Sequence, residues 1–273
     1  MLQLPSYIQF ETNTVCPNRC TFCPHDRMEG RAIATNELID KIIDQLIPTT
    51  KTCCPFLMQE PMHEHRLREI LMKIKRKNWK CQTVIYTTLG KCDMTMMKGI
   101  IDDMTLDHMM ISQYGSEWQP GLDIEQAEHD LNELVSYRRS QCKTKPVITM
   151  QCIDELGVYI DILRKSKSLA DGISIVPYDT FHGDKPLDTR IKGPVKERKP
   201  CSRLWNTFNI HSDGNVVPCC LDYNEKMIMG NMNMDDAKDI WNSPKFAELR
   251  QMHVDGRFDE IDLCRNCMVW EWQ

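Results

Sequence analysis

The sequence lacks the features that mark several classes of protein. No apolar run approaches the length of a membrane span, and the opening MLQLPSYIQFETN has no basic region followed by an apolar stretch, so no secretory signal is visible. The formal net charge of −5 is unlike the basic charge of nucleic-acid binders. We find no internal repeat or low-complexity segment. We therefore expect a cytoplasmic globular protein with no nucleic acid and no membrane as partner.

Cysteine, by contrast, is abundant, with 14 in 273 residues. Without an export signal these residues are not expected to form a disulfide framework, and clustered thiols in reducing cytosol favour metal ligation. Eight cysteines form two groups, near the amino terminus and after residue 200. The other six are expected to be small buried residues, although one could donate a hydrogen atom: Cys53, Cys54, Cys81, Cys92, Cys142 and Cys152.

The first two-thirds of the chain alternates strand-like and helix-like patterns. At 36–47, for example, Ile39, Ile42, Ile43 and Leu46 share one helix face and Pro48 ends it. The predicted strands are 7–12, 54–58, 83–87, 108–112, 147–152 and 172–177, and the predicted helices are 36–47, 64–77, 94–104, 124–139 and 159–169. This alternation predicts an α/β fold with a parallel sheet, open or closed into a partial barrel, whose ligands gather at the carboxyl ends of the strands.

A change of composition divides the chain. The stretch 181–200, FHGDKPLDTRIKGPVKERKP, is rich in basic residues and could be a binding strip, but a solvated connector is favoured. We expect an α/β domain at 1–184, a linker at 185–200 and a cysteine-containing module at 201–273.

The first cysteine group, in ETNTVCPNRCTFCPHD, directly follows the first predicted strand. Cys16, Cys20 and Cys23 are separated by three and then two residues. Three thiolates with this spacing can ligate three irons of a [4Fe–4S] cluster, which leaves the fourth iron open to a substrate or cofactor. A zinc site with His25 as fourth ligand is the alternative, and redox-inert thiols are another.

The segment CPNRCTFC at the end of a first β-strand resembles the signature of radical S-adenosylmethionine (SAM) enzymes. The resemblance implies that SAM binds the open iron through its amino and carboxylate groups. It also implies that an electron cleaves SAM to methionine and a 5′-deoxyadenosyl radical, which removes a hydrogen atom from the substrate.

Weaker features extend this resemblance along the chain. FLMQEP (56–61) stands where the family has a Gly-Gly-Glu-Pro turn, YTTLG (86–90) stands where it often has Thr-Asn-Gly, and a polar residue ends the fourth strand. Taken singly, each could be a helix cap or turn residue. The SAM contacts that the resemblance implies are Phe22, Glu60, Pro61, Thr88 and Ser112.

The second cysteine group offers four more metal ligands. SDGN (212–215) between two β-type runs predicts a hairpin that brings Cys201 and Cys219 to one end, and Cys264 and Cys267 close the site. Cys219 is preferred to Cys220 because neighbours in a strand point to opposite faces. From the residues alone, a zinc ribbon is a serious rival to an iron–sulfur cluster here, although the less favoured one.

Here too the residues carry a resemblance. A cysteine, a hairpin, Pro-Cys-Cys, Ile-Trp-Asn-Ser and a final Cys-x2-Cys are similar to the auxiliary-cluster module of the SPASM/Twitch group of radical SAM enzymes. The last pair lies close to residue 273, which implies the shorter Twitch form with one auxiliary cluster. The implied protein is a partial (β/α)6 TIM-like barrel followed by a Twitch module, with two [4Fe–4S] clusters and SAM as cofactors.

Within that group the chain is most similar to the 2-deoxy-scyllo-inosamine dehydrogenase type. A cluster with four cysteine ligands has no free iron site, so it is suited to accept an electron during oxidation of a small, sugar-like or aminocyclitol-like substrate. A reductase such as flavodoxin or ferredoxin would supply electrons to the first cluster. Predicted substrate contacts at the strand ends are Gln113, Tyr114, Gln151 and Tyr178, and His182 is either a catalytic base or an ordinary loop histidine.

Three other functions stay open. A redox-neutral epimerase would use a spare thiol as hydrogen donor. A peptide maturase is less favoured, because the first strand begins almost at once and leaves no room for a leader-recognition domain. A non-catalytic iron–sulfur or zinc module would not cleave SAM.

Overall fold

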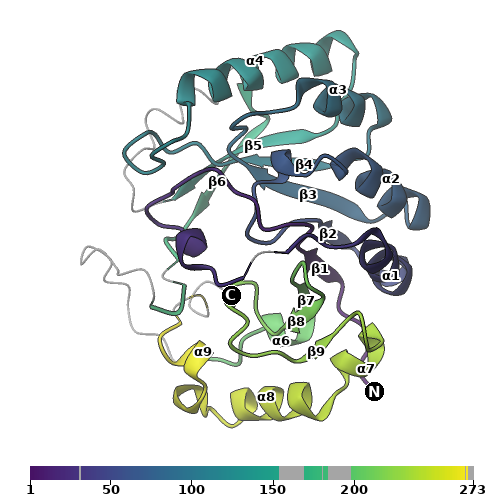
Figure 1. The fold of residues 1–273 in the computed structure, drawn as a ribbon, viewed down its shortest axis with the longest axis vertical. Coiled ribbons are helices and arrows are strands. Elements are labelled where there is room, and N and C mark those ends of the chain that lie inside the picture. The colour runs from purple at the N-terminus through teal and green to yellow at the C-terminus, as the bar shows by residue number, and fades with distance from the viewer. Residues whose placement is uncertain (31, 154–168, 180, 184–197, 268, 270–273) are drawn as a thin grey trace.

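The computed structural model describes residues 1–30, 32–153, 169–179, 181–183, 198–267 and 269 (Figure 1). Almost all of the predicted helix at 159–169 and most of the predicted linker at 185–200 lie outside these residues.

A single sheet runs through the described residues, in the strand order β6-β5-β4-β3-β2-β1-β7-β8-β9. The first six strands pair in parallel and in chain order, which confirms the predicted α/β partial barrel. Their bounds are β1 Tyr7–Phe10, β2 Thr52–Cys54, β3 Gln82–Thr87, β4 His108–Ile111, β5 Val147–Ile153 and β6 Gly172–Val176.

One predicted strand, 54–58, was wrong in position. β2 ends at Cys54, with Thr52 opposite Tyr7 of β1. Pro55 follows and has no N–H to donate to a neighbouring strand. The side-chain oxygen of Gln59 then accepts the Leu57 N–H at 3.0 Å, which turns the chain. The apolar run at 55–58 therefore forms a loop at the carboxyl end of β2.

Helices follow strands β1 to β4 and line the outer side of the sheet (Figure 1). They are α1 Asn36–Leu46, α2 Leu67–Lys77, α3 Met94–Asp103 and α4 Ile124–Ser140. Three begin at a side chain that accepts an amide of the first turn (Thr35, Asp93 and Asp123), each cap contributing about 1 kcal/mol. Helix α2 begins later than predicted because Pro61–His63 form a 3-10 turn, η3. None of the helices described is long and apolar enough to cross a membrane.

The carboxyl-terminal part continues the same sheet. Its elements are α6 Arg203–Asn206, β7 Thr207–Ile210, β8 Asn215–Val217, β9 Gly230–Asn231, α7 Ala237–Trp241, α8 Pro244–Val254 and α9 Asp262–Arg265. Strands β7 and β8 are antiparallel, which confirms the predicted hairpin. Gly214 occupies the turn with φ +91°, and a Cβ there would lie 2.3 Å from the Asn233 side chain.

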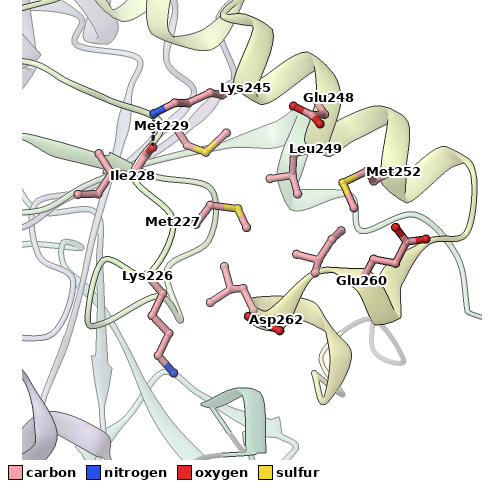
Figure 2. A pocket seen from close by; sticks show the side chains of 12 residues that line it. Lys226, Met227, Ile228, Met229, Lys245, Glu248, Leu249, Met252, Glu260 and Asp262 are labelled. Carbon is pink, nitrogen blue, oxygen red and sulfur yellow. Dashed lines mark hydrogen bonds between the residues drawn. The ribbon is translucent and has the colours of Figure 1, made fainter.

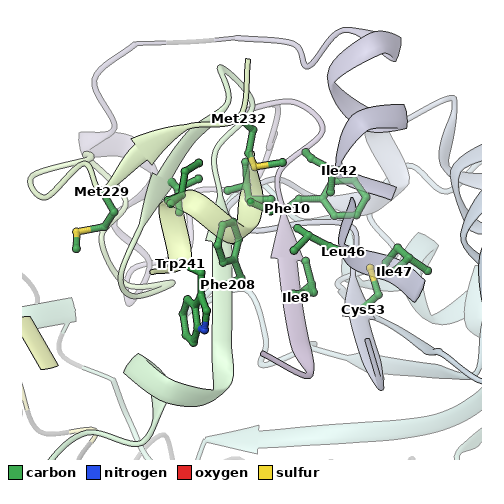
Figure 3. Packing of buried hydrophobic residues seen from close by; sticks show 14 of the residues in the cluster. Ile8, Phe10, Ile42, Leu46, Ile47, Cys53, Phe208, Met229, Met232 and Trp241 are labelled. Carbon is green, nitrogen blue, oxygen red and sulfur yellow. The ribbon is translucent and has the colours of Figure 1, made fainter. Parts of the chain in front are cut away.

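Parallel pairing of β7 with β1 joins this part to the barrel, with Tyr7 opposite Thr207. A shared core lies behind the two strands, where Ile8 and Phe10 of β1 pack with Phe208 of β7 and with Trp241 of α7 (Figure 3). The rings of Phe208 and Trp241 are 6.0 Å apart. The pattern at 201–273 did not predict this connection. The division at 184 and 201 stays a prediction, since the sheet is continuous across it.

Four of the six scattered cysteines are buried as expected: Cys53, Cys54, Cys81 and Cys152. Cys92 is partly exposed. Cys142 was wrongly expected to be buried, because it follows α4 in a left-handed turn with φ +52° and is exposed.

Candidate active site and metal centres

The first cysteine group surrounds one cavity. The loop after β1 places Cys16, Cys20 and Cys23 around a space of about 340 Å³. The three thiols are each partly exposed, and the Cys23 N–H donates to the Cys20 carbonyl at 3.1 Å. The x3 and x2 spacing therefore presents the sulfurs to a common space instead of packing them into the core.

These thiols fit a cation that binds thiolates. Burial raises the pKa of Cys16 and of Cys20 to about 12, and neighbouring thiols act in the same direction. Bound iron would offset the cost of deprotonating them. In the described part of the chain, no group of three or more His, Cys, Asp or Glu side chains is placed to hold one metal ion. In an iron–sulfur cluster, each cysteine contacts a different iron.

Glu60 ties the loops around this cavity together. Its carboxylate accepts the Thr88 N–H at 2.9 Å and the Thr88 hydroxyl at 2.8 Å, and also the Thr87 hydroxyl. The Glu60 N–H donates to the Val15 carbonyl at 3.0 Å, beside the first cysteine. Asn18, between two cysteines, donates to the Thr88 hydroxyl at 3.0 Å. Pro61 follows as the first residue of η3. Burial raises the pKa of Glu60.

A second cavity, of about 270 Å³, adjoins the first, because Cys20 and Cys23 line both. It lies at the carboxyl ends of β3 to β6, as predicted for ligands of a parallel barrel. It brings together six residues that the sequence predicted for SAM or substrate: Phe22, Thr88, Ser112, Tyr114, Gln151 and Tyr178.

Four of these six residues, Phe22, Ser112, Tyr114 and Gln151, contact one another. The Gln151 side-chain oxygen accepts the Tyr114 hydroxyl at 2.7 Å and the Ser112 hydroxyl at 3.2 Å. The Phe22 ring meets the Tyr114 ring edge to face, with centroids 5.3 Å apart. The cavity therefore combines an aromatic side with fixed polar groups, which suits a small polar ligand beside an aromatic base.

Three of the residues predicted to contact SAM or substrate, Glu60, Pro61 and Gln113, do not line this cavity, and two polar residues that do, Gln119 and Asp179, were missed. Gln113 is buried and donates to the Thr88 carbonyl at 3.0 Å. Gln119 lines the cavity, accepts the Tyr114 N–H at 2.6 Å and donates to the Ser112 carbonyl, and no sequence pattern marked it. Asp179 also lines it, and burial raises its pKa. Its position after the last barrel strand, next to Tyr178, could have identified it.

The second cysteine group also lines a single cavity. Cys201, Cys219, Cys264 and Cys267 come from the start of the module, the turn after β8, and α9 with the residues beyond it. Four thiols around one small space match the donor set of a cluster with no open iron.

Cys219, and not Cys220, faces this cavity. The two residues lie in a turn after β8, so the strand alternation behind the prediction does not apply. A hydrogen bond from Cys220 and the charge of Arg203 lower the pKa of Cys219, while that of Cys220 is raised. The Leu221 N–H points at the Cys219 sulfur at 3.5 Å. Cys219 is thus the better thiolate donor.

His182 lies at the second cysteine cavity and is absent from the lining of the cavity of Tyr178. It is buried with φ +62°, and neither ring nitrogen has a hydrogen-bond partner among the described residues. Its role as a base stays a prediction, with Asp179 better placed.

A further cavity, of about 610 Å³, is lined by none of the predicted residues (Figure 2). Met227, Met229 and Met252 point into it, between the segment before β9 and α8. Lys245 at its edge donates to the Ile228 carbonyl at 3.2 Å. Neither cysteine group lines it, but Leu249 and Leu263 line both this cavity and the cavity of the second cysteine group, so the two adjoin.

Comparison with known proteins shows what the chain resembles. Residues 201–268 match the SPASM family, an iron-sulfur cluster-binding domain. An S-adenosyl-L-methionine-dependent 2-deoxy-scyllo-inosamine dehydrogenase of Niallia circulans is 46% identical over 104 residues, which are 36% of this chain and 41% of that protein. The matched part is thus less than half of that relative.

Solved structures share the fold. BtrN in complex with AdoMet and 2-DOIA superposes with a TM-score of 0.71 at 19% identity, over 98% of this chain and 94% of BtrN. Streptococcus suis SuiB bound to precursor peptide SuiA gives a TM-score of 0.73 at 13% identity, over 92% and 67% of the two chains. These matches confirm the predicted barrel with an iron–sulfur module, and the resemblance to the SPASM/Twitch radical SAM group. The zinc-ribbon alternative for 201–268 is not supported.

Proposed function

We propose that this protein is a radical SAM oxidoreductase that removes two electrons from a small polar substrate. The observation that carries the proposal is the pair of adjoining cavities, one lined by three thiols and the other by aromatic and polar side chains. The Niallia circulans relative, named as a SAM-dependent dehydrogenase, supports the same class of reaction.

In this proposal Cys16, Cys20 and Cys23 hold the first [4Fe–4S] cluster, beside the cavity that receives SAM. When bound, this pair of cofactors supplies one-electron cleavage of SAM to a 5′-deoxyadenosyl radical. Phe22 offers its ring to the adenine. Glu60 acts indirectly, because its carboxylate fixes the Thr88 backbone that borders the cavity.

The substrate would bind in the same cavity, against Tyr114, Gln151 and Tyr178. Their hydroxyl and amide groups suit a polyhydroxylated ring, so we propose a sugar-like or aminocyclitol-like substrate. Oxidation of an alcohol carbon also releases a proton. Asp179 is a carboxylate at this cavity whose pKa is raised by burial, so we assign it as the acceptor of that proton.

Cys201, Cys219, Cys264 and Cys267 would hold the auxiliary cluster. With four cysteine ligands it supplies, when bound, a place for the second electron. A reductase such as flavodoxin or ferredoxin would donate electrons to the first cluster. We also propose the division into a barrel at 1–184, a linker at 185–200 and a Twitch module at 201–273, which the family match at 201–268 supports.

The alternatives fit less well. An epimerase needs a thiol donor at the substrate, but in the described residues the only cysteines that line the cavity are the predicted ligands Cys20 and Cys23. A peptide maturase draws support from the fold that this chain shares with SuiB, and the fold alone does not specify a substrate.

Turnover of 2-deoxy-scyllo-inosamine in deuterated solvent tests the proposal. The chain is reconstituted anaerobically, its iron is counted, and it is mixed with SAM and dithionite. We expect about eight irons, formation of a ketone, and no solvent deuterium on carbon. Deuterium at an inverted carbon would indicate an epimerase, and SAM cleavage without any product from cyclitols or sugars would contradict the proposed substrate class.

A further inference from the structure

The histidine of α8, His253, lies between two of the predicted auxiliary ligands. It is 1% exposed. The Cys201 N–H donates to Nδ1 of its ring at 3.3 Å. On the other side of the ring, Nε2 lies 3.4 Å from the Cys264 sulfur. One imidazole therefore contacts the backbone of one predicted ligand and the sulfur of another.

These two contacts fix the position of the ring hydrogen. A backbone N–H can only donate, so Nδ1 must offer its lone pair to Cys201. The hydrogen of a neutral imidazole is then on Nε2, and it points to the Cys264 sulfur. A thiolate can only accept a hydrogen bond. Donation from Nε2–H to the Cys264 sulfur is therefore consistent with Nδ1 accepting the Cys201 N–H.

Packing holds the ring in this orientation. The Phe258 ring meets His253 edge to face, with centroids 5.2 Å apart. The Arg198 guanidinium lies 4.4 Å from the Phe258 centroid, and its Nη2 donates to the Cys264 carbonyl at 2.7 Å. His253, Phe258 and Arg198 thus form a connected layer around Cys264.

We propose that His253 is a positioning residue that donates a hydrogen bond to the Cys264 thiolate of the auxiliary cluster and raises its reduction potential. Such a bond withdraws electron density from the sulfur and so favours the cluster state with one more electron. This inference rests on the proposed function, in which that cluster accepts the substrate electron. A weaker acceptor would leave the substrate radical unoxidised for longer.

The test isolates the auxiliary cluster. The full chain with Cys16, Cys20 and Cys23 replaced by alanine keeps only the second cysteine group. After anaerobic reconstitution, its cluster is titrated with dithionite in the presence of redox mediators and followed by electron paramagnetic resonance. His253→Leu removes the donor at similar volume, and His253→Gln is the matched control because its amide keeps an N–H near the position of Nε2.

We expect His253→Leu to bind as much iron as the parent with a more negative midpoint potential, and His253→Gln to restore most of the difference. Equal potentials in all three proteins would overturn the inference, as would loss of iron from both variants, which would make His253 a residue needed for assembly. A parent with no iron at all would count against the proposed function and not against the role of His253.

Discussion

At the scale of single residues, Cys219 and Cys220 offer a matched pair. They are adjacent and both near Arg203, whose Nη1 lies 3.7 Å from one sulfur and 3.3 Å from the other, but only Cys219 lines the cavity of the second cysteine group. We predict that Cys219→Ala lowers the iron content of the reconstituted chain from about eight to about four, because one of four ligands is lost. Cys220→Ala should keep all the iron. Iron counting of the two variants tests this prediction. Loss of iron in Cys220→Ala but not in Cys219→Ala would make Cys220 the ligand.

Asp179 and His182 are rival acceptors for the substrate proton. Asp179 lines the proposed substrate cavity, whereas His182 lines the cavity of the second cysteine group. We predict that Asp179→Asn lowers product formed per 5′-deoxyadenosine about 100-fold, the usual scale for loss of a base, while SAM cleavage continues. His182→Gln should change that ratio little. Chromatography of the oxidised product and of 5′-deoxyadenosine measures this ratio. A larger loss with His182→Gln than with Asp179→Asn would identify His182 as the proton acceptor instead.

Glu64 gives a prediction for stability against pH. Burial alone would raise the pKa of Glu64, but hydrogen bonds from Arg66 hold that pKa at about 2. The unfolded value is about 4.3, so the stabilisation is present above that pH and is lost as pH falls toward 2. We predict that Glu64→Gln costs about 2–3 kcal/mol at neutral pH and nearly nothing at pH 2. Urea unfolding of the apo chain measures this, with exposed Glu69→Gln as control.

The site shows which functional residues can be predicted from sequence patterns and which cannot. Spacing was enough to bring the first cysteine group to one cavity, because its three cysteines share the loop after β1. In the second group the predicted hairpin brought Cys219 to the cavity of Cys201. Ser112 and Gln151 were found because strand ends converge in a parallel barrel. Gln119 could not be found, because its contact with Tyr114 depends on the path of the loop after β4. His253 could not be found either, since helix α8 gives no sign of which face meets Cys264.

At the scale of elements, helices were predicted more closely than strand pairing. Capping residues and apolar faces are local signals, and they placed α1, α3 and α4 almost to the residue. Pairing between β1 and β7 joins segments 200 residues apart, and nothing local encodes it. That pairing makes the module an extension of the barrel sheet.

Trp241 tests this connection. It is fully buried, its ring is 5.1 Å from Phe246, and its indole N–H donates to the Gln3 carbonyl at 2.8 Å. We predict that Trp241→Ala destabilises the chain by about 3–5 kcal/mol, the usual cost of a large cavity. A single unfolding transition should shift as a whole, as followed by circular dichroism. Trp79→Ala, at a site 75% exposed, is the control, and a separate early transition for the module would contradict the shared core.

At the scale of the whole molecule, one sheet carries both cysteine groups. The first follows β1, the second surrounds the turn after β8, and β1 and β8 flank β7. The polar cavity shares Cys20 and Cys23 with the first group. In the second group, burial raises the pKa of Cys267, and the charge of Asp179 from the polar cavity acts in the same direction. This arrangement suits the proposed reaction, which would start at the first predicted cluster and end at the second.

The most direct measurement of the central claim is 5′-deoxyadenosine formed from SAM by the reconstituted chain under dithionite. We predict that it forms with the wild-type chain and with Cys220→Ala, and that Cys16→Ala abolishes it, since one of three ligands of the open cluster is gone. No 5′-deoxyadenosine from an iron-loaded wild-type chain, or undiminished formation by Cys16→Ala, would contradict the account.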